Sequence, residues 1–208
     1  MMTMKHTIVA VAALAASLAF VGHAHAQTQV GQPAPQFSAV DTAGKAVSLA
    51  DFKGKYVVLE WTNPECPFVQ KHYTSGNMQA TQKHAASKGV VWLQVNTTGG
   101  SEKDSKLAAE LAQWSKDQKT TAQALLMDGG KLGQAFGAKT TPHMYLIDPA
   151  GKLVYAGAID SKASANPGDI ATATNYVTQA INEVSAGKPV SKPVTGAYGC
   201  SVKYASAG

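Results

Sequence analysis

The stretch from Tyr56 to Val69, YVVLEWTNPECPFV, decides the fold because an apolar run ends a few residues before a cysteine. Residues 56–61 are rich in side chains favoured in strands, and the run is short enough for a buried central strand. After Cys66 the apolar side chains recur three and four residues apart, and Pro67 suits the first position of a helix. The stretch therefore predicts a strand, a turn and a helix, with Cys66 in the turn.

The rest of the chain continues to alternate between strand and helix patterns. A strand, a helix and a further strand in succession form a parallel crossover unit. With a hairpin and a helix near the end, this order predicts an α/β fold, an open sheet covered by helices on both faces. Sites in such sheets lie at the ends of central strands, where Cys66 is placed. The other expected elements are a hairpin over 36–40 and 46–49, a helix over 78–88, a strand over 90–95, a loop over 96–105, a helix over 106–116, a strand over 124–127, a helix over 131–136, a hairpin over 144–147 and 153–156, and a helix over 170–185.

The start of the chain is typical of a secretory signal peptide. A short positive segment (residues 1–5) precedes an apolar segment (residues 7–22), and Ala24-His25-Ala26 matches a cleavage site. The apolar segment is shorter than the roughly 20 residues that span a bilayer. We therefore expect residues 1–26 to be removed, which predicts a secreted, periplasmic protein without a membrane segment.

The remaining chain is expected to hold one domain and a tail. Its length allows one sizeable core, and a hydrophobic content of 45% is ordinary for a globular protein. The predicted domain covers residues 27–186. Residues 187–208 are rich in Pro and Gly, and we expect them to form a flexible C-terminal tail that carries Cys200.

Composition argues against several classes of function. The formal charge is +5, and the 18 basic residues, all of them lysine, are scattered along the chain. This pattern gives no indication of nucleic-acid binding, and we expect the lysines to lie on solvated faces. The sequence has no Gly-rich phosphate loop, and we expect neither an organic cofactor nor a metal.

The position of Cys66 is compatible with two roles, a reactive thiol and one half of a structural disulfide. A thiolate at a helix N-terminus is stabilised by unpaired backbone N–H groups and by the helix dipole, which favours a reactive cysteine. The neighbouring Glu65 acts in the opposite direction, because a carboxylate disfavours a second negative charge. In an oxidising compartment Cys66 could instead form a permanent disulfide with Cys200, which would stabilise the fold by several kcal/mol in the chain-entropy model.

The segment Trp61-Thr62-Asn63-Pro64-Glu65-Cys66 between strand and helix, with Thr141-Pro142-His143 before a later strand, resembles the thioredoxin-like superfamily. Within it the chain is most similar to the redoxin group, the peroxiredoxin-like proteins (alkyl hydroperoxide reductase and thiol-specific antioxidant) and their exported relatives. The resemblance implies a thioredoxin-like fold with a central mixed sheet, an N-terminal hairpin and a C-terminal tail. It also implies a cis Pro142 against Cys66, with a backbone edge left free for pairing with an extended peptide.

The chain departs from the patterns of this superfamily. Val69 stands where the thioredoxin C-x-x-C motif has its second cysteine, so a disulfide within the motif cannot form. Leu59 and Asn63 replace the Pro and the Thr or Ser of the peroxiredoxin motif, and the chain has no Arg to hold the thiolate. Thr62 and His143 are therefore candidate assisting residues, with Lys71 as a further substitute for the missing Arg.

The end of the tail, Tyr198-Gly199-Cys200-Ser201-Val202-Lys203-Tyr204, resembles tails of the same redoxin subgroup. This resemblance implies that Cys66 is the nucleophile of an exported oxidoreductase and Cys200 its resolving cysteine. The implied partners are a protein disulfide or hydroperoxide substrate and an unknown thiol reductant.

Two alternatives remain beside this prediction. The first is a non-catalytic thioredoxin-like binding module with a structural Cys66–Cys200 disulfide. The second is a copper(I) carrier, because Cys66, His143 and Met144 are residue types that bind this ion. His72 is expected to point away from Cys66 and to be a surface or half-buried residue.

Overall fold

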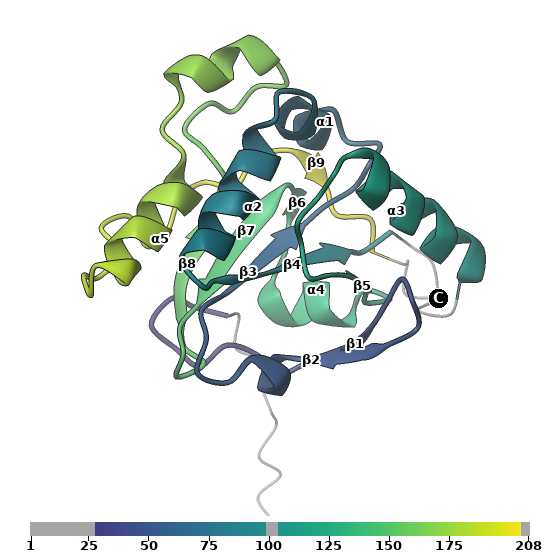
Figure 1. Ribbon diagram of the computed structural model, residues 1–208, viewed down its shortest axis with the longest axis horizontal. Helices are drawn as coiled ribbons and strands as arrows, with labels where there is room; N and C mark the ends of the chain where they lie inside the picture. Colours follow the sequence, from purple (N-terminus) through teal and green to yellow (C-terminus); the bar gives the residue numbers. More distant parts are fainter. Residues whose placement is uncertain (1–27, 99–103, 205–208) are drawn as a thin grey trace, which may run out of the picture.

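A mixed sheet of seven strands forms the centre of the structure, a computed structural model in which residues 28–98 and 104–204 are described (Figure 1). The predicted signal peptide lies outside these residues, as does half of the predicted loop over 96–105, residues 99–103. In sheet order the strands are β2 (Ala46–Ser48), β1 (Ser38–Asp41), β5 (Ala124–Met127), β4 (Val91–Asn96), β3 (Val57–Trp61), β7 (His143–Ile147) and β8 (Leu153–Gly157).

Strand β3 lies inside the sheet, as the apolar run at its start predicts. It pairs in parallel with β4 and antiparallel with β7, so that Trp61 lies opposite Val95 on one side and His143 on the other. All five side chains of β3 are buried, because helices cover both faces of the sheet. The chain leaves the end of β3 directly into the loop that carries Cys66.

The helices divide between the two faces of the sheet. Helices α1, α2 and α5 pack over a core that contains Val58, Met144 and Ile181, and α3 covers the same face near β5. The short helices η1 and α4 cover the opposite face, with Leu59 and Trp61. This is the predicted fold class, a central mixed sheet with helices on both faces. The helices are η1 (Leu49–Phe52), α1 (Pro67–Thr74), α2 (Asn77–Ser87), α3 (Ser105–Asp117), α4 (Lys131–Phe136), η2 (Pro167–Thr172) and α5 (Tyr176–Ser185).

The predicted helix over residues 170–185 is wrong over residues 170–175. The 3-10 helix η2 ends at Thr172, and α5 begins only at Tyr176. Asn175 has an extended backbone, and its side-chain oxygen accepts a hydrogen bond from the backbone N–H of Thr178 at 2.9 Å. The side chain therefore acts as an N-cap, which starts a new helix instead of continuing an old one.

The C-terminal tail is packed onto the domain and is not the flexible segment that its composition suggests. The N–H of Thr195 donates to the carbonyl of Ala156, whose N–H donates to the carbonyl of Pro193, so this part of the tail joins the edge of β8. Farther along, the strand β9 (Cys200–Ser201) pairs antiparallel with β6 (Thr140–Thr141) next to α1, as Figure 1 shows. Both strands have only two residues, too few for a periodic pattern in the sequence.

No helix in the described parts of the chain is long and apolar enough to cross a membrane.

Candidate functional site

Cys66 lies at the N-cap of α1, and the helix begins at Pro67 as predicted. Its backbone is extended, and its carbonyl accepts the first hydrogen bond of the helix, from the N–H of Gln70 at 2.9 Å. The backbone N–H of Val69 favours the thiolate. The side chain is 1% exposed, so the sulfur is available only to an atom that reaches into the site.

The segment before β7 closes one side of the thiol. The peptide bond between Thr141 and Pro142 is cis, which confirms the expectation for Pro142. The Cys66 thiol donates a hydrogen bond to the carbonyl oxygen of Thr141 at 3.0 Å. Two segments far apart in the chain therefore meet at the sulfur.

The tail brings Cys200 to the same place, with both cysteines as free thiols. Burial raises the pKa of the Cys66 thiol, but hydrogen bonds from Cys200, from the Thr141 side chain and from the backbone outweigh burial and lower it. Burial, the hydrogen bond to Cys66 and the charge of that neighbour raise the pKa of Cys200 to about 11. Of the two sulfurs, Cys66 is therefore the one that ionises first.

Two buried hydroxyl groups lie near the ends of the strands that flank the site. The side-chain oxygens of Thr62 and Thr141 have no hydrogen-bond partner within the described residues. The Thr141 hydroxyl stabilises the thiolate. A buried hydroxyl without a partner has lost its hydrogen bonds to water, so it can donate a hydrogen bond to an acceptor that enters the site. Thr62 fits the predicted assisting role to that extent.

His143 does not lie beside Cys66. Consecutive strand residues point to opposite faces, and His143 shares the face of Trp61 and Tyr145, whereas Met144 shares the core of Cys66. The ring nitrogen Nδ1 of His143 accepts a hydrogen bond from the backbone N–H of Lys139 at 3.3 Å and lies 3.2 Å from the hydroxyl of Tyr145, and burial lowers the pKa of His143 to about 4. The residues considered for copper(I) therefore do not converge, and no group of three or more His, Cys, Asp or Glu gathers within residues 28–98 and 104–204.

A buried charged cluster lies behind Cys66, and the sequence did not reveal it. The amine of Lys71 is 3.6 Å from Asp160, with side-chain exposures of 0% and 1%. The hydroxyl of Tyr198 donates a hydrogen bond to Asp160 at 2.5 Å and contacts Nε2 of His72 at 3.1 Å. The expectations of a solvated Lys71 and of a surface or half-buried His72 are therefore wrong, because the tail covers this side of α1.

A second buried charged group, Glu60, was also not predicted, although its position in the sequence indicates it. Glu60 interrupts the apolar run of β3 and is fully buried. Its carboxylate accepts hydrogen bonds from Tyr73 at 2.7 Å and from Trp92 at 2.8 Å. Burial raises its pKa from 4.5 to about 7, although these bonds oppose the rise. A charged residue inside a predicted central strand is the pattern that indicates such a network.

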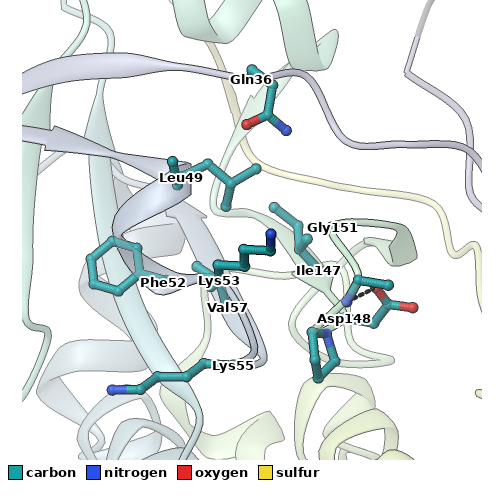
Figure 2. Close-up of a pocket in the computed structure, with 12 residues that line it drawn as sticks. Gln36, Leu49, Phe52, Lys53, Lys55, Val57, Ile147, Asp148 and Gly151 are labelled. Carbon is teal, nitrogen blue, oxygen red and sulfur yellow. Dashed lines mark hydrogen bonds between the residues drawn. The ribbon is translucent and has the colours of Figure 1, made fainter.

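The two cavities described next do not lie at Cys66 and Cys200. The cavity in Figure 2, of about 250 Å³, lies between Val57 and Ile147, at the opposite end of β3 from Cys66. Lys53 extends across its opening, whereas Lys55 points away from it (Figure 2). Another cavity, of about 380 Å³, is lined by His143 and the tail. The candidate site is therefore the covered thiol pair and not a large pocket.

Comparison with known proteins places the chain in a family. The family model described as AhpC/TSA matches residues 30–156. The protein named thiol-disulfide oxidoreductase ResA from Bacillus subtilis is 31% identical over 124 residues, which are 60% of this chain. The match spans 64% of the length of that relative. A protein of the same name from Bacillus cereus is 25% identical over 126 residues, 61% of this chain and 68% of its own.

Solved structures share the fold at lower sequence identity. An uncharacterised conserved protein from Geobacillus kaustophilus has a TM-score of 0.72 at 21% identity and covers 88% of this chain and 95% of its own. The thioredoxin domain of a thiol-disulfide oxidoreductase from Bacteroides vulgatus has a TM-score of 0.51 at 23% identity and covers 70% of this chain and 98% of its own. The fold is thus thioredoxin-like, and because the family model matches more than half of its length, the chain belongs to the AhpC/TSA family.

Proposed function

We propose that this chain is a thiol-based oxidoreductase in which Cys66 is the nucleophile and Cys200 the resolving cysteine. The observation that supports the proposal is the meeting of two free thiols whose pKa values are displaced in opposite directions. Relatives named thiol-disulfide oxidoreductases support the same class of activity. The substrate is a protein disulfide or a hydroperoxide, and a thiol reductant restores the pair.

The reaction proceeds in two exchanges of sulfur bonds. The Cys66 thiolate attacks one sulfur of a substrate disulfide, whose S–S bond breaks so that the other sulfur leaves with the electron pair. Cys200 then loses its proton and attacks the sulfur of Cys66, which releases the substrate as a dithiol and forms a Cys66–Cys200 disulfide. With a hydroperoxide, the Cys66 thiolate attacks the terminal oxygen, the O–O bond breaks, and an alcohol, or water from hydrogen peroxide, leaves with the electron pair. Condensation of the resulting sulfenic acid with the Cys200 thiol then forms the disulfide and releases water.

The surrounding residues take supporting parts in this proposal. Pro142 holds the Thr141 carbonyl against the thiol and shapes the approach of the substrate. The buried hydroxyl of Thr62 is a donor for the charge that develops on the leaving atom. His143 supports the segment before β7 from the opposite face of the sheet, and we assign it no proton transfer with Cys66.

Export belongs to the proposal as well. We propose that residues 1–26 are removed and that residues 27–186, with the tail over 187–208, work in the periplasm. The signal pattern of the sequence supports this, and mass measurement of the protein recovered from a periplasmic extract tests it. A mass that retains residues 1–26 would contradict the proposal.

Single-turnover oxidation tests the proposed chemistry. Reduced protein is mixed with a protein disulfide and, separately, with hydrogen peroxide, and the loss of free thiols is followed. Cys66→Ser should abolish the faster of the two reactions, whereas Cys200→Ser should stop it at the mixed disulfide or the sulfenic acid. If Cys66→Ser leaves both rates unchanged, the enzymatic function is wrong.

The reduction potential of the Cys66–Cys200 pair separates a working disulfide from a structural one. We expect a value above roughly −250 mV in glutathione buffers, in the range of labile disulfides. A value below about −300 mV would show that the bond is a structural disulfide. That result would favour the binding module over the enzyme.

A further inference from the structure

The backbone edge next to Cys66 is occupied by the protein's own tail. Strand β6 pairs with β9, with Thr141 opposite Cys200 and Thr140 opposite Ser201, and within the described residues it has no other strand partner. The expectation of a free edge at Pro142 is therefore wrong. An extended peptide that adds to a sheet edge uses the same backbone groups, so the tail and such a peptide exclude each other.

Gly199 fits the tail closely against this edge. Its φ of 135° lies in the region that favours glycine. A Cβ built on this residue would fall on the carbonyl oxygen of Thr141, the same oxygen that accepts the hydrogen bond of the Cys66 thiol. Only a residue without a side chain allows the tail to lie here.

Contacts on both sides of β9 hold the tail in place. Before the strand, Tyr198 bonds Asp160 at 2.5 Å and packs its ring against Phe68 of α1, with ring centres 5.9 Å apart. After the strand, the N–H of Val202 donates to the carbonyl of Lys139 at 3.0 Å. The hydroxyl of Tyr204 donates to the carbonyl of Ala138 at 2.6 Å. A competing peptide has to displace several of these contacts together.

We propose that residues 198–202 are a specificity determinant that excludes extended polypeptides from Cys66, so that the thiol reacts with small oxidants while the tail is in place. The inference rests on the proposed function, because it assumes that Cys66 is a nucleophile. Cys66 is 1% exposed and packs with Tyr198 and Cys200, and β9 already occupies the place of an added strand.

Two mixed disulfides with the same leaving group test this inference. One is a linear peptide whose single cysteine is linked to thionitrobenzoate, and the other is mercaptoethanol linked to thionitrobenzoate, which has no peptide backbone. The Cys66 thiolate attacks the aliphatic sulfur of either probe, which is that of cysteine or of mercaptoethanol. The S–S bond breaks, and thionitrobenzoate leaves with the electron pair. Its absorbance reports the rate.

The native chain should react at least about tenfold more slowly with the peptide probe than with the probe that lacks a backbone. This factor is expected because the peptide has to displace one or two hydrogen bonds of the tail. Gly199→Ala should raise the ratio of the peptide rate to the other rate at least about tenfold. A change in the pKa of Cys66 when Cys200 moves acts on both rates alike and cancels in this ratio. Gly196→Ala is the matched control, because a Cβ there meets nothing within 4 Å, and it should change neither rate.

Tyr198→Phe gives a second variant that keeps the ring on Phe68 and removes the hydroxyl, in case Gly199→Ala disturbs the fold. It should raise the peptide rate by a smaller factor. Hydrogen exchange of the Val202 amide reports whether the tail has left, and the amide should exchange faster in both variants.

The outcomes separate the two claims. Equal reactivity of the native chain with both probes, an equal effect of Gly199→Ala on both rates, or a faster peptide reaction with an unchanged Val202 amide would overturn the role of the tail. If neither probe reacts with Cys66 in the native chain or in the variants, the proposed function fails, and this inference fails with it.

Discussion

Cys66 obtains its lowered pKa from hydrogen-bond donors and not from a basic side chain. The chain has no Arg, and the groups that favour the thiolate are Cys200, the Thr141 hydroxyl and the backbone N–H groups of Val69 and Cys200. Lys71, considered as a substitute, is instead engaged with Asp160. Hydrogen bonds to a charged group are stronger than those between neutral groups, so a few donors can take the place of a cation.

At this scale, Cys200→Ala should raise the pKa of Cys66, because it removes a donor that favours the thiolate. A rise of about one unit is the size expected for the loss of one hydrogen bond to a charged group. The dependence of the Cys66 alkylation rate on pH measures it. Cys200→Ser is the matched control, since its hydroxyl can still donate, and it should shift the profile less. An unchanged or lower pKa in Cys200→Ala would contradict this explanation.

At the scale of elements, helix α1 is held between the sheet and the tail. Val69, Lys71, His72 and Tyr73 are buried, and only the side that carries Pro67, Gln70 and Thr74 is exposed. The amine of Lys71 donates to the carbonyl of Lys162 at 2.8 Å, while the oxygen Oδ2 of Asp160 has no hydrogen bond among the described residues and depends on the charge of Lys71. The pair thus links α1, the loop after β8 and the tail.

Removal of one partner of this pair should be costly. Lys71→Met keeps the length of the side chain and leaves Asp160 buried without its counter-charge, which should lower the free energy of unfolding by about 3–5 kcal/mol. The double variant Lys71→Met/Asp160→Asn should recover a large part of the loss, and urea unfolding measures both. Lys53→Met, at an exposed lysine, is the control and should stay within about 0.5 kcal/mol. Equal losses in the single and double variants would show that the charge is not the cause.

At the scale of the whole molecule, local sequence patterns predicted the structural features that depend on residues close together in the chain. Strand β3 and the start of α1 at Pro67 follow from periodicity and from the proline, whereas the mixed sheet and the cis Pro142 follow from resemblance. The sequence could not show the β6–β9 pair, whose strands are too short for periodicity, or the burial of Lys71. That burial depends on Asp160 and Tyr198, which are distant in the chain, and a lysine without a known partner is expected in solvent.

Glu60 links the layers of the molecule and should make its stability depend on pH. Its hydrogen-bond donors come from α1, α2 and β4, among them Tyr73, Gln82 and Trp92. Burial raises its pKa from 4.5 to about 7, so between these values the native chain keeps a proton that the unfolded chain has lost. The resulting stabilisation is complete below pH 4.5 and is lost as the pH rises to about 7.

Urea unfolding from pH 4 to 8 tests this dependence by comparing the native chain with Glu60→Gln, whose amide cannot ionise. The shift of the Glu60 pKa corresponds to about 3 kcal/mol, and the difference in unfolding free energy between the two proteins should change by about this amount across the range. His72 and His143, whose pKa values burial lowers to about 4, act in the opposite direction and are common to both proteins. Their contribution cancels in the difference, so parallel stability curves would mean that the pKa of Glu60 is the same in the native and the unfolded chain.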